Sequence, residues 1–218
     1  LALLPSLNST VWQPLGVRSA ENPGIPGIAG FSRQNPVLFV DNSASELLVF
    51  GVQQPSRSKE DRDVGSGADP VPNQESLGTM WVTRSTDWGR TFAAVKPFDP
   101  YHGSWGRNSL LLGLDGSWLM PVYNESGKTK GHQFEHSAIL RKPVGAPVLP
   151  LAGWVGAPMN DTSFLVQPSV IRLKPGQPNL RVYYRDRRAQ WIYTATSSDD
   201  GLSMSTFCHS QRRYAFRA

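Results

Sequence analysis

The feature that most constrains the fold is one β-strand pattern that occurs three times along the chain. Each copy has an apolar run, a short turn rich in Gly, Pro, Asp or Asn, a second apolar run and then a third. The first runs begin at Asn35-Pro36, Arg107-Asn108 and Gln167-Pro168. Short apolar runs separated by turn residues predict antiparallel strands. Repetition of such a unit predicts a protein built from several similar small sheets.

Composition agrees with an all-β fold class. The 218 residues include 20 Gly and 18 Pro. A helix interior loses a backbone donor at every Pro and about 1 kcal/mol at every Gly, so an all-helical protein is excluded. The single cysteine, Cys208, excludes an internal disulfide and a multi-cysteine metal site. No apolar run approaches the length of a membrane-spanning helix, so we expect no membrane span.

Two segments share the pattern S-x-D-x-G-x-[ST]-Φ, where Φ is a large apolar residue. They span 85–92 and 197–204, and we call them the SxDxG turns. An Asp carboxylate can accept hydrogen bonds from turn N–H groups, and Gly permits a positive φ, so the pattern suits a tight hairpin. We therefore assign a structural role to Ser85, Asp87, Gly89, Phe92, Ser197, Asp199 and Gly201. The middle repeat has Arg141-Lys142-Pro143 where this turn would fall.

The SxDxG turns resemble the Asp-boxes of BNR-repeat proteins. The surrounding sequence resembles the sialidase-like (neuraminidase) branch of that group over about residues 31–206. The most similar segments are Asn35–Phe39, Arg107–Ser109 and Gln167–Ser169. The resemblance implies a six-bladed β-propeller, of which this chain supplies about three blades. It also implies a glycoside hydrolase of the exo-sialidase type, in which arginines bind an anionic carbohydrate or sialoglycoconjugate.

The repeats give the expected domain organisation. A ring of three blades is incomplete, so we expect the missing blades in a longer chain or self-association through open sheet edges. The expected parts are a lead-in or partial blade at 1–34, a first blade at 35–95 with an inserted loop at 53–75, a second blade at 101–158, a third at 163–206 and a divergent tail at 207–218. We interpret the Pro/Gly/Ala-rich stretch 142–158 as a second insertion.

Antiparallel connectivity predicts where functional residues gather. The start of a first strand, the end of a second and the start of a third lie at one end of a blade, and the SxDxG turn lies at the other. The predicted substrate-binding residues at that end are Arg107, Asn108, His136, Gln167, Arg185 and Arg187, and the candidate catalytic residues are Tyr123, Glu125 and Glu135. Structural alternatives remain open: an inter-blade contact for Arg107, surface charge for Arg187, aromatic packing for Tyr123 and a hydrogen-bonded rim position for His136. We transfer neither the acid/base Asp nor the nucleophilic Tyr of the sialidases to this chain.

The positive charge lies in the second half of the chain. Eight basic and ten acidic residues give 1–100 a charge of −2, whereas 14 basic and seven acidic residues give 101–218 a charge of +7. Arginine binds carboxylate or phosphate, so the partner is an anionic sugar or a nucleic acid. No basic helix, RNP-like motif or zinc spacing supports nucleic acid, and we predict no nucleic-acid partner, metal or cofactor.

The alternative to hydrolysis is a non-catalytic glycan-binding propeller module, which would keep the arginines without a complete set of catalytic groups. Three N-glycosylation sequons, at Asn8, Asn124 and Asn160, favour a secreted or lumenal location.

Overall fold

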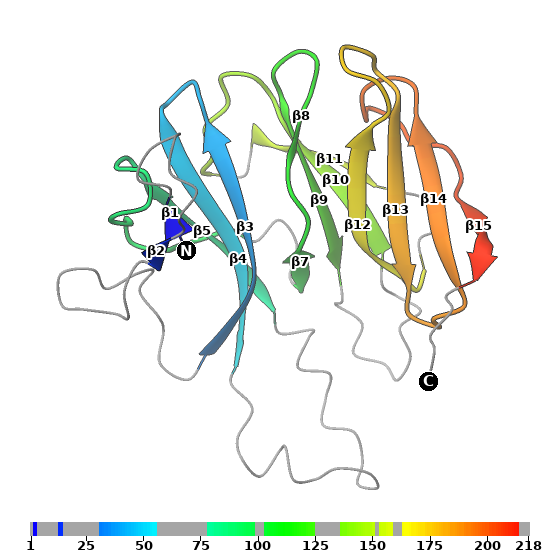
Figure 1. Ribbon diagram of the computed structural model, residues 1–218, viewed down its shortest axis with the longest axis horizontal. Helices are drawn as coiled ribbons and strands as arrows, with labels where there is room; N and C mark the ends of the chain where they lie inside the picture. The colour runs from blue at the N-terminus through cyan, green and yellow to red at the C-terminus, as the bar shows by residue number, and fades with distance from the viewer. Residues whose placement is uncertain are drawn as a thin grey trace, which may run out of the picture.

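The computed structural model of the chain describes residues 2–3, 13–14, 31–55, 78–98, 103–124, 136–150, 153–158 and 163–213. All secondary-structure elements within these residues are β-strands. They form three main antiparallel sheets that follow one another in chain order (Figure 1). The all-β, propeller-type fold class predicted from the repeats is therefore confirmed. The described part of the chain also has no helix long and apolar enough to cross a bilayer.

Each sheet is built mainly from sequential neighbours. The first sheet has the order β3 (Phe31–Asp41), β4 (Glu46–Pro55), β5 (Thr79–Ser85), β6 (Lys96–Pro97). In the second sheet, β7 (Ser104–Gly106) and β8 (Leu111–Leu112) both pair with β9 (Trp118–Asn124), followed by β10 (His136–Lys142) and β11 (Val155–Pro158). The third sheet has the order β12 (Leu165–Arg172), β13 (Leu180–Asp186), β14 (Trp191–Ser197), β15 (Cys208–Arg213). The short strands β1 (Ala2–Leu3) and β2 (Gln13–Pro14) pair in a separate two-stranded sheet.

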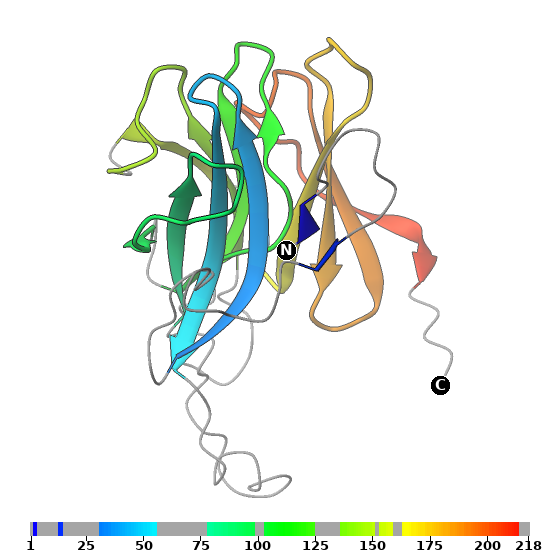
Figure 2. The same ribbon diagram turned by 60° about the vertical axis from the view of Figure 1, so that its left-hand side comes forward.

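The second sheet is apolar on both faces because it packs between the other two sheets (Figures 1 and 2). Successive side chains of a strand point to opposite faces. Accordingly, Trp118 and Met120 of β9 pack with the first sheet, whereas Leu119 packs with the third. Burial of a side chain such as Leu119 contributes about 1.5–3 kcal/mol. The continuous apolar run 118–123 is thus explained by burial on two faces.

Four stretches differ from the sequence-based expectation. Residues 53–55 belong to β4 rather than to an inserted loop, and the remainder of that loop lies outside the described residues. The stretch 142–158 is not simply an insertion, because it contains β11, which pairs with β10. The third sheet extends past residue 206, because β15 pairs with β14. The first strand of the second repeat, expected at 107–112, is divided into β7 and β8 around residues 107–110.

The first strand of every sheet is irregular at the same place in the repeat. The pairing of β3 with β4 shifts between Gln34 and Val37, and the pairing of β12 with β13 shifts between Val166 and Ser169. Asn35 and Gln167 both have a positive φ, 52° and 56°. Each precedes a Pro, which has no N–H to donate to a ladder. The repeated dipeptides that mark the start of each unit in the sequence are therefore β-bulges, or in the second sheet a break in the strand.

The two SxDxG turns share one hydrogen-bond geometry. In the first turn, Gly89 N donates to Ser85 Oγ at 2.7 Å and Thr91 N donates to Asp87 Oδ1 at 2.8 Å. In the second, Gly201 N donates to Ser197 Oγ at 2.8 Å and Ser203 N donates to Asp199 Oδ1 at 2.9 Å. This agreement supports the structural role that the sequence predicted for these residues.

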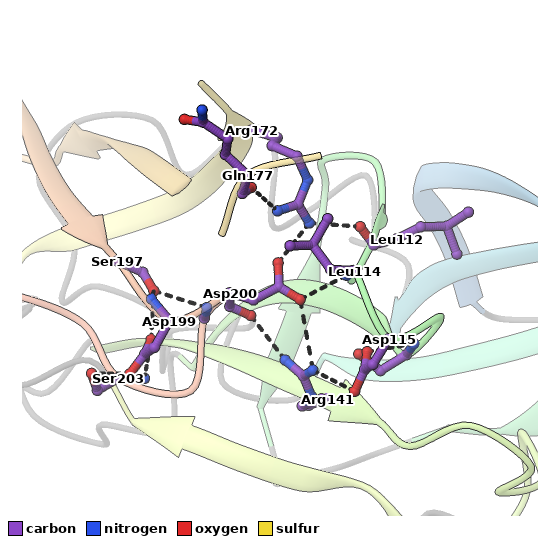
Figure 3. Close-up of polar contacts among 12 residues, drawn as sticks. Leu112, Leu114, Asp115, Arg141, Arg172, Gln177, Ser197, Asp199, Asp200 and Ser203 are labelled. Atoms are coloured by element: carbon purple, nitrogen blue, oxygen red, sulfur yellow. Dashed lines mark hydrogen bonds and ion pairs between the residues drawn. The ribbon is translucent and has the colours of Figure 1, made fainter. Parts of the chain in front are cut away.

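A polar cluster joins the second and third sheets at the end that carries the SxDxG turns (Figure 3). Asp200 lies at its centre. Its carboxylate accepts a hydrogen bond from Leu114 N at 2.8 Å and forms an ion pair with Arg172 at 2.6 Å. Arg141 donates to the Asp200 backbone O at 2.8 Å and pairs with Asp115 at 2.8 Å. We call these four charged residues the Asp200 cluster.

Candidate functional site

An open pocket of about 390 Å³ lies where the second and third sheets meet, at the end remote from the SxDxG turns. It is formed by the segment after β7, the beginning of β12, the end of β13 and the beginning of β14. Its lining residues are Arg107, Asn108, Gln167, Ser169, Tyr183, Tyr184, Arg185 and Ile192. Four of the six predicted substrate-binding residues are thus brought together in one pocket.

The alternation of β13 places Arg185 in the pocket. Leu180, Val182 and Tyr184 are buried in the core of the third sheet, whereas Arg181, Tyr183 and Arg185 lie on the other, more accessible face. Arg185 pairs with Val166 of β12 and with Ile192 of β14, so both its backbone neighbours are fixed. Arg185 therefore extends from a strand in the interior of the sheet, where its backbone has a defined position.

Asp186, the next residue, has a different role. Its side chain is fully buried and accepts hydrogen bonds from Arg188 N, Arg188 Nε and Gln190 N at 3.1, 3.0 and 3.3 Å. The hydrogen bond to Asp186 raises the pKa of Arg188, and the Arg188 guanidinium lies 5.0 Å from the centre of the Phe164 ring. Asp186 and Arg188 therefore brace the β13–β14 turn.

The two pocket arginines are exposed, and neither has an acidic partner among the residues that the structure describes. Among the described residues no ion pair involves Arg107 or Arg185. The described residues that line the pocket include no Asp or Glu. Burial raises the pKa of the Tyr184 phenol well above its usual range, so this side chain is neutral at physiological pH. The pocket consequently has a positive character and suits a carboxylate or phosphate ligand.

The Asn108 amide binds the backbone of β12. Its Nδ2 donates to the backbone O of Gln167 at 3.0 Å and to that of Pro168 at 2.8 Å. The amide therefore links the segment after β7 to the bulge in β12.

The remaining predicted residues do not line this pocket. Tyr123 is only 4% exposed and stacks on Trp105 with ring centres 6.4 Å apart, which favours the packing role. Arg187 is half-buried in the turn after β13, where its N donates to Phe164 O at 2.9 Å. His136 is exposed at the start of β10, opposite Asn124. Glu125 and Glu135 lie outside the described residues.

Sequence reasoning missed four lining residues: Ser169, Tyr183, Tyr184 and Ile192. A signal for Tyr183 was present, because residues two apart on a strand share a face and Arg185 was already a candidate. Arg33 of β3 does not line this pocket, and its guanidinium lies 4.8 Å from the Trp81 ring centre. No group of three or more potential metal ligands occurs in the part of the chain that the structure describes.

Comparisons with known proteins agree with this architecture. The family model described as BNR repeat-like domain matches residues 10–211. Comparison with curated proteins finds no match. The fold is similar to a protein of unknown function from Dyadobacter fermentans, with a TM-score of 0.60 and 14% identity over 87% of this chain and 54% of that one.

Two sialidase structures are also similar in fold. A Hadza microbial sialidase has a TM-score of 0.58 and 17% identity over 94% of this chain and 38% of its own. The leech intramolecular trans-sialidase has a TM-score of 0.55 and 11% identity over 89% of this chain and 41% of its own. The chain thus spans about half or less of the length of these three structures. The match to the family model covers nearly all of the chain, which belongs to the BNR repeat-like domain family.

Proposed function

We propose that the chain forms the sugar-recognition part of a sialidase-like glycoside hydrolase domain and that its pocket binds the carboxylate of an anionic sugar. The observation that carries this proposal is the pair of exposed guanidinium groups, Arg107 and Arg185, which come from adjacent sheets and line one pocket. A guanidinium can bind a carboxylate through two parallel hydrogen bonds. Two of them favour a carboxylated sugar over a neutral one.

The other lining groups suit the rest of a sugar. Gln167, Ser169 and Tyr183 are half-buried, and their polar groups can exchange hydrogen bonds with hydroxyl or amide groups. The aromatic ring of Tyr183 offers an apolar face beside them. The two similar sialidase structures support the choice of a sialic-acid-like ligand for this proposal.

Binding of N-acetylneuraminic acid to the 218-residue chain tests the proposal, with its neutral methyl ester as the control ligand. We expect Arg107→Ala and Arg185→Ala each to weaken binding of the acid at least tenfold, because a hydrogen bond to a charged group contributes about 1.5–3 kcal/mol. Arg90→Ala is the matched control, since Arg90 is exposed in an SxDxG turn at the other end of the first sheet. Equal binding of acid and ester by the unmodified chain would contradict the proposal.

Hydrolysis requires groups besides the arginines. Glu125 and Glu135 are the candidate bases or polarising groups that the sequence offers, and Tyr123 is the remaining candidate. We expect this chain alone to release no fluorophore from 4-methylumbelliferyl N-acetylneuraminic acid, and a longer polypeptide with additional β-sheets to do so. Fluorophore release by the 218-residue chain, lost in Arg107→Ala, would show that the three sheets suffice.

A non-catalytic glycan-binding module is the second candidate function. It is favoured by one observation: the described residues that line the pocket include arginines, amides and phenols but no carboxylate to act as acid or base. This function predicts selective binding of the acid with no fluorophore release from any longer polypeptide that contains the chain. The two functions therefore differ in turnover and agree in binding.

A further inference from the structure

The two arginines of the pocket lie in segments that differ in backbone hydrogen bonding. Arg185 lies within β13, paired on both sides. Arg107 lies in the segment 107–110 between β7 and β8, outside any strand. The separation of the two guanidinium groups therefore depends on what holds this segment against the third sheet.

Asn108 makes the polar link between that segment and the third sheet at the pocket. Its Nδ2 lies 3.0 Å from Gln167 O and 2.8 Å from Pro168 O. These residues form the bulge that directly follows Val166, the β12 partner of Arg185. The side chain of Asn108, which follows Arg107 in the chain, thus binds β12, the strand that pairs with Arg185.

The bulge explains why an asparagine suits this position. The shift in pairing between Val166 and Ser169, with Gln167 at φ 56°, takes two consecutive residues out of the regular ladder. Carbonyl groups that leave a ladder need other donors when they are shielded from water. An amide NH₂ has two N–H groups, one for each carbonyl. Because both neighbours are acceptors, the nitrogen of the amide and not its oxygen must face them.

Other polar links between these sheets come from residues that do not line the pocket. Ser137 Oγ donates to Leu165 O at 3.0 Å in the buried interface, and Arg172 donates to Leu112 O at 2.9 Å at the opposite end. Neither Ser137 nor Arg172 lines the pocket, whereas Asn108 does. Its effect should therefore be strongest on the geometry of the pocket.

We propose that Asn108 is a positioning residue, which sets the separation of the Arg107 and Arg185 guanidinium groups by holding the Gln167–Pro168 bulge. This role is added to the contact with substrate expected from the sequence: Nδ2 of the amide binds the backbone, and Oδ1 can still accept a hydrogen bond from a ligand. The consequence for ligand selectivity rests on the proposed function. The consequence for geometry does not, and it is tested without a ligand.

The first experiment measures the separation directly. Positions 107 and 185 are changed to cysteine and labelled with nitroxides, in a background in which the exposed Cys208 is changed to serine. Electron paramagnetic resonance then reports the dipolar broadening between the labels. We expect Asn108→Asp to alter this broadening, because a carboxylate cannot donate to the two carbonyls. Asn179→Asp, the same change at an exposed position in the β12–β13 turn, should leave it unchanged.

A second variant, Asn108→Ser, controls for two other effects of Asn108→Asp: misfolding and the added negative charge. Asn108→Ser is neutral and keeps one donor, so we expect an intermediate spectrum. Spectra of Asn108→Asp and Asn108→Ser that both match Asn179→Asp would overturn the positioning role.

The second experiment keeps both arginines and measures binding of N-acetylneuraminic acid and its methyl ester. We expect Asn108→Ser to reduce the preference for the acid at least fivefold, while thermal unfolding shows that the chain remains folded. If the unmodified chain shows no preference, the proposed function fails and the resonance experiment still decides the role of Asn108. If the preference exists and Asn108→Ser retains it in full, the inference for selectivity fails.

Discussion

Asp87 and Asp199 illustrate how single carboxylates shape this fold. The hydrogen bond from Thr91 Oγ1 at 2.6 Å, with others from Thr91 N and Ser85 Oγ, lowers the pKa of Asp87 to about 2. Burial alone would raise the pKa of Asp199, yet hydrogen bonds from Ser203 and Ser197 outweigh it and lower that pKa to about 2 as well. Both groups are therefore bound more tightly to their turns as carboxylates than as acids.

This predicts a loss of stability in acid. Because both pKa values are lower in the folded state than the ordinary 3.8, the ionised groups stabilise the fold above pH 3.8, and that contribution is lost as the pH falls from about 4 to 2. We expect the double variant Asp87→Asn and Asp199→Asn to be less stable than the unmodified chain at pH 7 and to lose less stability between pH 4 and pH 2.5. Urea unfolding at these pH values measures both effects. An unchanged pH dependence in the double variant would show that other groups control acid unfolding.

The sequence predicts the strands and turns whose own side chains form an apolar run or a turn motif. The apolar runs of β4, β9 and β13 and the two SxDxG turns could be predicted because burial and turn chemistry act on the residues themselves. β11 and β15 could not, because Val155–Pro158 and Cys208–Arg213 lack a strand-like apolar pattern and are strands only through pairing with β10 and β14. Tertiary pairing overrides a weak local preference in both cases.

The candidate site was predictable to a similar extent. Antiparallel connectivity alone brings the start of β12 and the end of β13 to one end, and Gln167 and Arg185 do line one pocket there. The packing of Tyr123 on Trp105 and the backbone contacts of Asn108 depend on contacts that no pattern in a single strand encodes.

The Asp200 cluster links two elements of different sheets and offers a test of that link. The side chains of Asp200 and Arg172 are only 11% and 12% exposed, whereas that of Asp115 is 57% exposed. We expect Asp200→Asn to destabilise the chain by about 1–3 kcal/mol, because it leaves the poorly solvated Arg172 guanidinium without its counter-charge. Asn also tolerates the positive φ of 59° at this position, so backbone strain does not contribute.

Asp115→Asn is the matched variant, with the same chemical change at a mostly exposed carboxylate whose partner, Arg141, keeps a second acidic neighbour in Asp200 at 3.7 Å. Its cost should be below about 1 kcal/mol, since exposed ion pairs contribute little. Denaturant unfolding of both variants gives the comparison, and equal costs would refute the dependence on burial.

Across the whole molecule, each of the three sheets has its first strand at an edge, and these edges carry exposed apolar side chains. Leu38 of β3, Leu112 of β8 and Ile171 of β12 are 45%, 49% and 43% exposed. Edge strands with apolar side chains favour association with another sheet. We propose that further β-sheets of a longer polypeptide, or other copies of this chain, cover these edges.

These exposed apolar edges should cause the chain to self-associate. We expect the 218-residue chain to associate as its concentration rises, and a triple variant with Leu38→Thr, Leu112→Thr and Ile171→Thr to associate less, because threonine keeps the β-propensity while reducing exposed apolar area. Sedimentation or light scattering measures the mass. The control variant carries Val144→Thr and Leu202→Thr, both 64% exposed but in turns rather than at sheet edges. Association lowered equally by both variants would mean that exposed apolar area in general, and not the first strands, drives it.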